Sequence, residues 1–133
     1  MIRDLSESIG DLLRASAPFA AVDILFERPI SQFEPERTTV DVFLYDIREN
    51  MELRSTEALI GREKGKAKIH PPPLRVACSY IVTAWPVGGT EHALQEHRLL
   101  SHVLQLLSHY PTLPTEFLRG SLKDQTPPLP MIT

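Results

Sequence analysis

Residues 71–114 decide the fold of this chain, and they read PPPLRVACSYIVTAWPVGGTEHALQEHRLLSHVLQLLSHYPTLP. The segment begins with a proline stop, continues as a long apolar strand over 74–85, turns at Gly88-Gly89 and ends in a helix of about five turns. None of its residues is arranged as a catalytic set. The segment therefore predicts elements that pack and present faces, which favours a structural or assembly role over an enzyme.

The strand and the helix in this segment are both patterned for packing. One face of the strand carries Val76, Cys78, Tyr80, Val82 and Ala84, and the other carries Ala77, Ile81 and Trp85. The helix is predicted to have Thr90 as its N-cap and to run to about His109, because Pro111 stops it. Its apolar stripe consists of Leu99, Leu100, Val103, Leu106 and Leu107.

The rest of the chain adds elements before and after this segment. The expected bounds are a helix over 3–15, strands over 20–27 and 38–47, a polar loop over 30–37, a hairpin with strands 52–60 and 66–70 joined around 61–65, a helical turn over 115–122 and an extended proline-rich tail over 126–133. Strand 38–47 has apolar residues on both faces, so both are predicted to be covered over part of its length. The order predicts an α+β class with a mixed or mostly antiparallel sheet, an N-terminal helix, a long helix after the last strand and a projecting β-hairpin. The two helices are expected to cover one face of the sheet.

Length and composition exclude several classes of protein. The 133 residues fit one domain, predicted to cover 1–125 with the hairpin as an arm at about 52–70. The net charge of −3 gives no general attraction to nucleic acid or to an anionic membrane. No apolar run approaches the roughly 18 residues that span a bilayer, and the acidic N-terminal MIRDLSESIGDLL is unlike a secretion signal. A single cysteine excludes an internal disulfide and suits a reducing compartment, so a cytoplasmic location is expected.

No group of residues predicts catalysis, a bound cofactor or a metal. The histidines at the long helix, His92, His97, His102 and His109, are spaced five, five and seven residues apart, whereas metal pairs on a helix need a spacing of three or four. We interpret this spacing as spreading them around the helix, as solvent-facing or interface residues. Cys78 lies in mid-strand with no group nearby to lower its pKa, which indicates a small core residue rather than a nucleophile.

Five residues are candidates for contact with a partner, and four of them lie at the hairpin tip. Arg62, Lys64, Lys66 and Lys68, set against Glu63, give this tip a net charge of +3. Three interpretations stay open: a solvated loop, a contact with nucleic acid, or an arm that docks onto an acidic protein. In the last case the strand edges of the hairpin can add to the sheet of the partner.

The fifth candidate is Glu96, which falls near the middle of the apolar stripe of the long helix. In one interpretation the stripe starts only after Glu96, and the carboxylate is exposed at the beginning of the helix. In the other the carboxylate forms an ion pair with Arg75 or with a neighbouring subunit, because a buried carboxylate is costly unless it is paired.

Long stretches of the sequence resemble one family. They are MIRDLSESIGDLL at the N-terminus, TTVDVFLYDIRENMELRS over 38–55, the segment 71–114, FLRGSL over 117–122 and PPLPMIT at the end. Together they resemble the domain at the N-terminus of cap, or tail-terminator, proteins of phage-tail-like contractile injection systems, including the virulence-cassette and antifeeding-prophage types. The resemblance extends over nearly the whole chain, and none of its motifs is catalytic.

The resemblance implies an assembly role with no cofactor, metal or small-molecule substrate. Such proteins form a hexameric ring on the distal end of the inner tube and sheath, stop polymerisation and hold the sheath extended in a particle that can be released. The implied partners are further copies of the chain and the sheath and tube proteins, with no nucleic acid and no membrane. Members of the family continue past PPLP with a helix and a terminal strand, so the chain is expected to represent part of that architecture. Two alternatives remain: a baseplate or adaptor component of the same particle, and a small hydrolase that uses Cys78 or a histidine.

Overall fold

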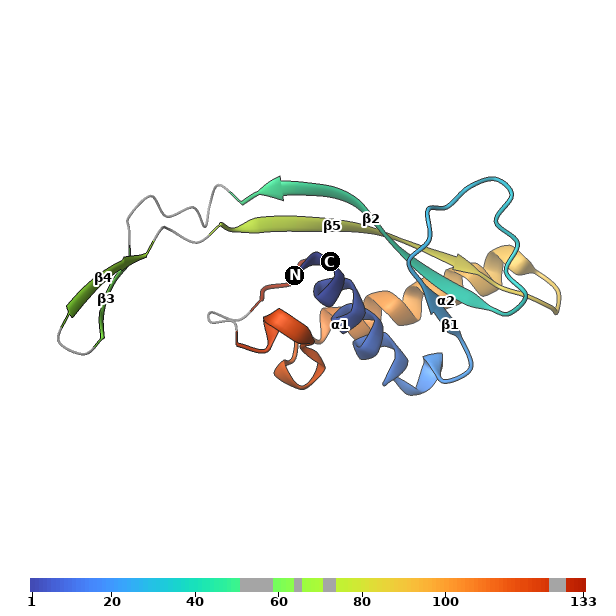
Figure 1. The fold of residues 1–133 in the computed structure, drawn as a ribbon. Coiled ribbons are helices and arrows are strands. Elements are labelled where there is room, and N and C mark those ends of the chain that lie inside the picture. The colour runs from blue at the N-terminus through green and yellow to red at the C-terminus, as the bar shows by residue number, and fades with distance from the viewer. Residues whose placement is uncertain (51–58, 64–65, 71–73, 125–128) are drawn as a thin grey trace. The chain divides into compact units, whose positions relative to one another are not determined.

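The computed structural model describes the chain except for residues 51–58, 64–65, 71–73 and 125–128 (Figure 1). The elements are α1 (Ile2–Arg14), β1 (Asp23–Leu25), β2 (Thr39–Glu49), β3 (Leu59–Glu63), β4 (Lys66–His70), β5 (Val76–Trp85), α2 (His92–Ser108) and 3₁₀ turns at Ala17–Phe19, Thr115–Phe117 and Gly120–Leu122. The chain divides into two compact units, one of Met1–Leu44 with Ile81–Thr133 and the other of Tyr45–Tyr80. Among the described residues, no helix is long and apolar enough to cross a lipid bilayer.

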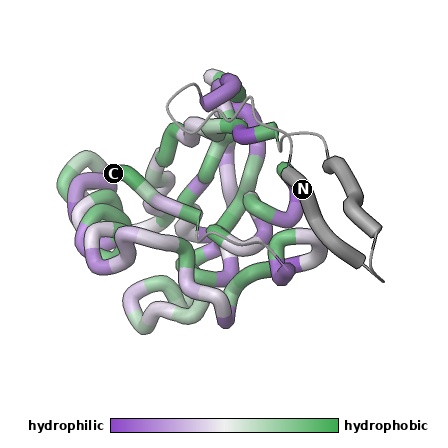
Figure 2. The backbone as a smooth tube through the Cα atoms, turned by 90° about the vertical axis from the view of Figure 1, so that its left-hand side faces the viewer, coloured by the Kyte–Doolittle hydropathy of each residue, from purple (hydrophilic) through white to green (hydrophobic). Residues whose placement is uncertain are grey.

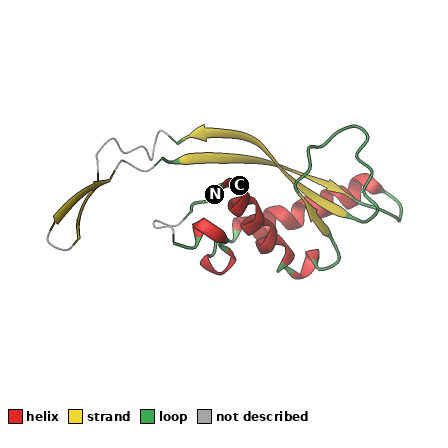
Figure 3. Cartoon of the chain, in the orientation of Figure 1, coloured by secondary structure: helices red, strands yellow, loops and turns green. Residues whose placement is uncertain are grey.

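Strands β1, β2 and β5 form a mixed sheet in that order. β1 runs parallel to β2, with Ile24 opposite Val40, while β5 runs in the opposite direction to β2 (Figure 1). β3 and β4 form a separate antiparallel pair. The predicted α+β class, with a mixed sheet, an N-terminal helix, a long helix after β5 and a β-hairpin, is therefore confirmed (Figure 3).

β1 is shorter than the strand predicted over 20–27. Pro18 lies at the start of a 3₁₀ turn, and Phe19 behind it is buried, so the chain is still turning where the sequence alternation indicated a strand. The amide of Val22 donates to the carbonyl of Phe19 at 3.1 Å, which extends the turn. Pairing with β2 is consequently confined to Asp23–Leu25.

The start of α2 also differs from the prediction, because Thr90 is not its N-cap. Glu91 takes that position in the left-handed region with φ of 57°, and no side chain caps the helix. The carbonyl of Thr90 instead accepts a hydrogen bond from Gln95 Nε2 at 2.7 Å. The preceding Gly88 and Gly89 have positive φ values as well, so the turn enters α2 one residue later than a threonine cap requires.

In the hairpin, the first strand extends further than predicted. Gly61 to Glu63 were expected to belong to the connecting loop, because the sequence pattern is that of a β-hairpin with a glycine-containing loop. They pair with β4 instead, and the ladder continues to the pair Glu63–Lys66. The predicted strand residues 52–58 lie outside the described part of the chain.

The core of the larger unit joins α1 to the C-terminal segment. Leu12 of α1 packs with Leu113, Leu118 and Leu122 in one buried cluster. The chain after α2 is held there by backbone hydrogen bonds of 2.8 Å, which join 111–113 to 129–131. Figure 1 shows α1 and α2 on the same side of the sheet. In Figure 2 hydrophobic and hydrophilic residues alternate along the chain, as amphipathic elements require.

A polar contact fixes the same C-terminal segment on the outer face of α1. Arg119 binds both carboxylate oxygens of Asp11, through Nε to Oδ2 and through Nη2 to Oδ1 at 2.8 Å. The backbone amide of Arg119 donates to Ser8 Oγ at 3.0 Å, and Ser121 Oγ donates to Asp4 Oδ2 at 2.8 Å. The hydrogen bonds from Ser121 hold the pKa of Asp4 below its usual value. The FLRGSL motif thus serves to attach the end of the chain to its first helix.

The burial of β2 changes along its length. All four residues of Thr39–Val42 are buried, whereas Tyr45 is 57% exposed and Ile47 47% exposed. The loop before β2 reaches β5, because the ring of Phe33 meets the ring of Trp85 edge-on, with centroids 4.9 Å apart. The predicted cover on both faces is therefore confirmed for the beginning of the strand and ends before Tyr45.

Candidate functional site

The hairpin of β3 and β4 contains three of the four cations that the sequence singles out. The backbone register places Arg62 opposite Ala67, Lys66 opposite Glu63 and Lys68 opposite Gly61. Lys64 lies outside the described residues. The ladder therefore gathers positive residues on a single two-stranded element within the unit Tyr45–Tyr80. Their role in binding a partner stays a prediction.

Glu96 is exposed in the first turns of α2. The apolar stripe begins after it, since Leu99 and Leu100 are half-buried and Val103 is buried. This arrangement agrees with the interpretation in which the carboxylate faces solvent. Because Glu96 is exposed, its charge does not need an ion-pair partner. The role of Glu96 at an interface also stays a prediction.

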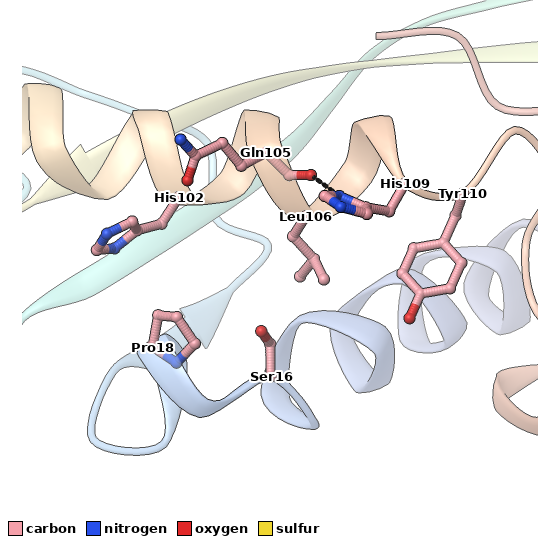
Figure 4. Close-up of a pocket in the computed structure, with 7 residues that line it drawn as sticks. All are labelled: Ser16, Pro18, His102, Gln105, Leu106, His109 and Tyr110. Atoms are coloured by element: carbon pink, nitrogen blue, oxygen red, sulfur yellow. Dashed lines mark hydrogen bonds between the residues drawn. The ribbon is translucent and has the colours of Figure 1, made fainter.

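A shallow groove of about 310 Å³ lies between α2 and the chain that follows α1 (Figure 4). Its lining residues are Ser16, Pro18, His102, Gln105, Leu106, His109 and Tyr110. His102 and His109 both line the groove, because seven residues are about two helical turns and return a side chain to the same face. The interpretation that the histidines spread around the helix is therefore wrong for this pair. The signal was present in the spacing of seven.

The two imidazoles of the groove have separate partners. His109 Nδ1 lies 2.6 Å from the carbonyl oxygen of Gln105 (Figure 4), and the ring of His102 meets Phe19 edge-on at 6.5 Å. Ser16 has no hydrogen bond to either imidazole in the described part of the chain, so the groove contains no activated hydroxyl there. No group of three potential metal ligands occurs among the described residues.

The thiol of Cys78 is also unsuited to nucleophilic attack. Partial burial in β5 raises the pKa of Cys78, so the thiol stays protonated near neutral pH. The thiolate is the reactive form, and its population falls as the pKa rises. This environment agrees with the interpretation of Cys78 as a packing residue.

Asp41 is a buried carboxylate that the sequence analysis did not single out. It lies in β2 with no exposed surface, and its Oδ1 accepts the backbone amide of Glu27 at 2.8 Å. Its Oδ2 is buried with no hydrogen-bond partner among the described residues. Burial raises the pKa of Asp41, and the negative charge of Glu27 adds to this effect. The signal in the sequence was an aspartate between two valines in an apolar strand.

Comparisons with known proteins identify relatives that match most of the chain. Residues 4–132 match the family described as the Pvc16 N-terminal domain. A solved structure described as the PVC sheath/tube terminator in the extended state, from a cryo-EM study of an extracellular contractile injection system, is similar with a TM-score of 0.67 and 26% identity. The similarity covers 90% of this chain and 42% of that one, so the chain spans less than half the length of this relative. No curated protein matches the sequence.

Proposed function

Because the chain belongs to the Pvc16 N-terminal domain family, we propose that it is a structural subunit that caps the tube and sheath of a contractile injection particle. In this role it ends polymerisation at the distal end and anchors the extended sheath. The observation that carries the proposal is the similarity to a sheath/tube terminator, because it covers 90% of this chain rather than one isolated motif. The chemistry of the described residues supports it, since neither the groove nor Cys78 offers an activated nucleophile.

The partners in this proposal are further copies of the chain, in a ring that is expected to be a hexamer, and the sheath and tube proteins. A subunit that ends a tube must match the last ring of that tube with one face and offer no equivalent face for the next ring. Contacts of this kind repeat around an axis and are heterologous, so each copy uses two different surfaces. The basic hairpin and exposed Glu96 are candidates for such surfaces, and small molecules and nucleic acid have no place in the proposal.

The role is tested in cells that assemble the particle with and without the natural, full-length protein. Without a terminator, tubes are expected to vary widely in length and the sheath to lose its extended state in electron micrographs. Restoring the protein should restore a single length. Unchanged length and sheath state without the protein would overturn the proposal. A gold label on the protein separates the alternatives, since a label at the baseplate end would make it a baseplate or adaptor component.

The hairpin is tested by reversing the charge of Lys64, Lys66 and Lys68 to Glu. The tip has a net charge of +3 whereas the whole chain has −3, so an electrostatic contact with an acidic partner should weaken at least tenfold in a pull-down with assembled tubes and sheath. A control variant reverses three exposed cations elsewhere, and these are Arg28, Arg98 and Lys123.

The control has the same change in net charge, so it separates the position of the charges from their number. Equal binding of the hairpin variant and the natural protein would remove the hairpin from the interface. Equal losses in both variants would show that net charge, and not the arm, governs docking.

A further inference from the structure

The unit Tyr45–Tyr80 is built from pairs of strands. It contains the β3–β4 pair and the ends of β2 and β5, and the described residues supply no third strand beside either pair. β1 pairs with β2 only at Thr39–Asp41, so it does not extend along the part of β2 in this unit. Two-stranded ribbons are marginally stable in water, and a third strand is normally needed. The ribbon formed by the ends of β2 and β5 therefore lacks neighbouring strands on both of its edges within the described part of the unit.

The edge formed by β5 lacks two of the usual protections of an exposed strand, which are charged residues and proline. Proteins protect such edges with charged residues, proline or bulges. The sequence of β5, VACSYIVTAW, contains no charged residue and no proline. Tyr45 and Ile47 on the neighbouring strand are large, apolar and about half-exposed. An uncharged edge beside exposed apolar side chains is typical of a strand that pairs with another chain.

We propose that a second copy of this chain supplies the missing strand, with the edge of β5 over 76–79 pairing with the edge of β2 over 45–48 of the next copy. One chain presents both edges, and pairing β5 with β5, or β2 with β2, would leave the other edge open. Pairing β5 with β2 covers both edges with a single heterologous contact, which is the kind of contact from which rings are built. The inference rests on the proposed function, because it assigns the contact between copies in the terminator ring.

The charges on the two edges are compatible with this pairing. On β2, Asp46 and Arg48 form an ion pair with each other at 2.6 Å. The facing residues of β5 carry no charge, so the contact places no like charges opposite one another. A strand from the sheath or tube protein is the competing occupant, and the experiment below is designed to detect it.

The test uses the single natural cysteine, Cys78 in β5, as a marker of one edge. A second, size-tagged full-length protein contains Cys78→Ala and Ile47→Cys, which moves the only cysteine to β2. The two proteins are mixed, added to assembled tubes and oxidised mildly. We expect a disulfide-linked heterodimer on non-reducing gels at no less than ten times the yield of either homodimer. A parallel mixture with Tyr45→Cys covers a register shift of two residues.

Each other outcome overturns the inference. Homodimers without heterodimers would show that like edges pair, and cross-links to sheath or tube proteins would identify the competing occupant. The absence of every cross-link, with Cys78 of the free protein still labelled by a maleimide, would show that Cys78 does not lie opposite Ile47 or Tyr45 of the next copy and would overturn the pairing. Native mass spectrometry and tube binding of the same samples separate this result from the proposed function. Rings that bind tubes without the heterodimer refute only the pairing, whereas failure to bind tubes refutes the function itself.

A backbone variant tests the same pairing independently. Asn50 N–H donates to the carbonyl of Arg75 at 2.8 Å, so Arg75 faces β2 and the backbone of the next residue, Val76, faces outward. Val76→Pro removes that outward donor, and we expect it to reduce the heterodimer yield at least tenfold, while Val76→Thr leaves the yield unchanged. An unchanged yield with Val76→Pro contradicts the pairing. If circular dichroism shows that Val76→Pro is unfolded, the cysteine mixture decides alone.

Discussion

Leu12 in α1 is 2% exposed, whereas Ile47 in β2 is 47% exposed, and the two residues belong to the two compact units of the chain. In the larger unit, Leu12 is covered by leucines from the C-terminal segment. In the unit Tyr45–Tyr80, β2 continues past the end of its cover, and the exposed apolar residues Tyr45 and Ile47 alternate there with charged ones. The difference teaches that the first region covers its apolar side chains from within the chain, whereas the second leaves large apolar side chains exposed, as at the contact proposed above.

The largest loss of stability in either region should come from Leu12→Ala in the buried core. Deleting a buried leucine removes its contacts and leaves a cavity, so the free energy of unfolding should fall by about 2–5 kcal/mol. The matched control is Leu104→Ala on α2, where the side chain is 57% exposed. It should change the free energy of unfolding by less than about 0.5 kcal/mol. Urea denaturation followed by circular dichroism measures both, and equal losses would contradict the assignment of the core.

A smaller loss should follow from Gly120→Ala, which loosens the attachment of the C-terminal segment. Gly120 has φ of 53°, and an added Cβ would lie 2.6 Å from Cγ of Asp4. Backbone strain and the displacement of Asp4 should together lower the free energy of unfolding by about 1–2 kcal/mol. Gly88→Ala isolates the strain, because its φ is 79° and nothing lies within 4 Å of the added Cβ. A loss in Gly120→Ala no larger than in Gly88→Ala would show that Asp4 moves away freely.

Asp41→Asn should stabilise the larger unit at pH 7 by about 1 kcal/mol, because it removes a buried charge whose second oxygen is unpaired. The pKa of Asp41 is raised above its ordinary value of 3.8 in the folded state. Stability from its protonation is fully present below 3.8 and is lost as pH rises through the raised pKa. The advantage of Asp41→Asn should therefore disappear at low pH.

Thermal denaturation between pH 3 and 8 measures this dependence for Asp41→Asn. Asp46→Asn serves as the control, since Asp46 is half-buried and paired with Arg48 on the surface. An advantage of Asp41→Asn that does not change with pH would show that the buried charge is not its cause.

The smallest effect on folding should come from Ile47→Ser in the second unit. Its side chain is already about half-exposed, so the free energy of unfolding of the isolated chain should change by no more than about 0.5 kcal/mol. The same variant should lower occupancy on assembled tubes, because Ile47 lies on the proposed edge. A large loss of stability in the isolated chain would show that Ile47 belongs to a core within the chain and would make the two regions alike.

The sequence predicted most elements because their patterns are local. The period of α1, the alternation in β2 and the proline that ends α2 depend on residues close in the chain. The errors arose where distant contacts decide. Burial of Phe19 shortens β1, and the backbone path through Glu91 displaces the helix cap from Thr90. The position of Asp41 between two valines indicated a buried carboxylate, but its partner could not be predicted, because the amide that binds it belongs to Glu27 and only the fold brings the two together.

The candidate site was predictable in composition rather than in geometry. The excess of positive charge near the hairpin tip follows from the sequence, but the pairing of Glu63 with Lys66 required the strand register. The groove shared by His102 and His109 could have been found from their spacing of seven, whereas its other wall comes from Ser16 and Pro18 after α1. The open edges of the ribbon could not be predicted, because the length of β1 decides where they begin.

The edge-on contact between Phe33 and Trp85 makes the intrinsic fluorescence of Trp85 sensitive to the position of the loop that contains Phe33. Trp85 is the only tryptophan in the chain, so all indole emission comes from one position at the end of β5. Its Nε1 donates to Thr83 Oγ1 at 2.9 Å, which holds the ring in a defined orientation. Binding that moves the loop with Phe33 away from this ring would expose the indole to water and shift its fluorescence to longer wavelength. Docking of the chain onto a partner can thus be followed in real time without attaching a dye.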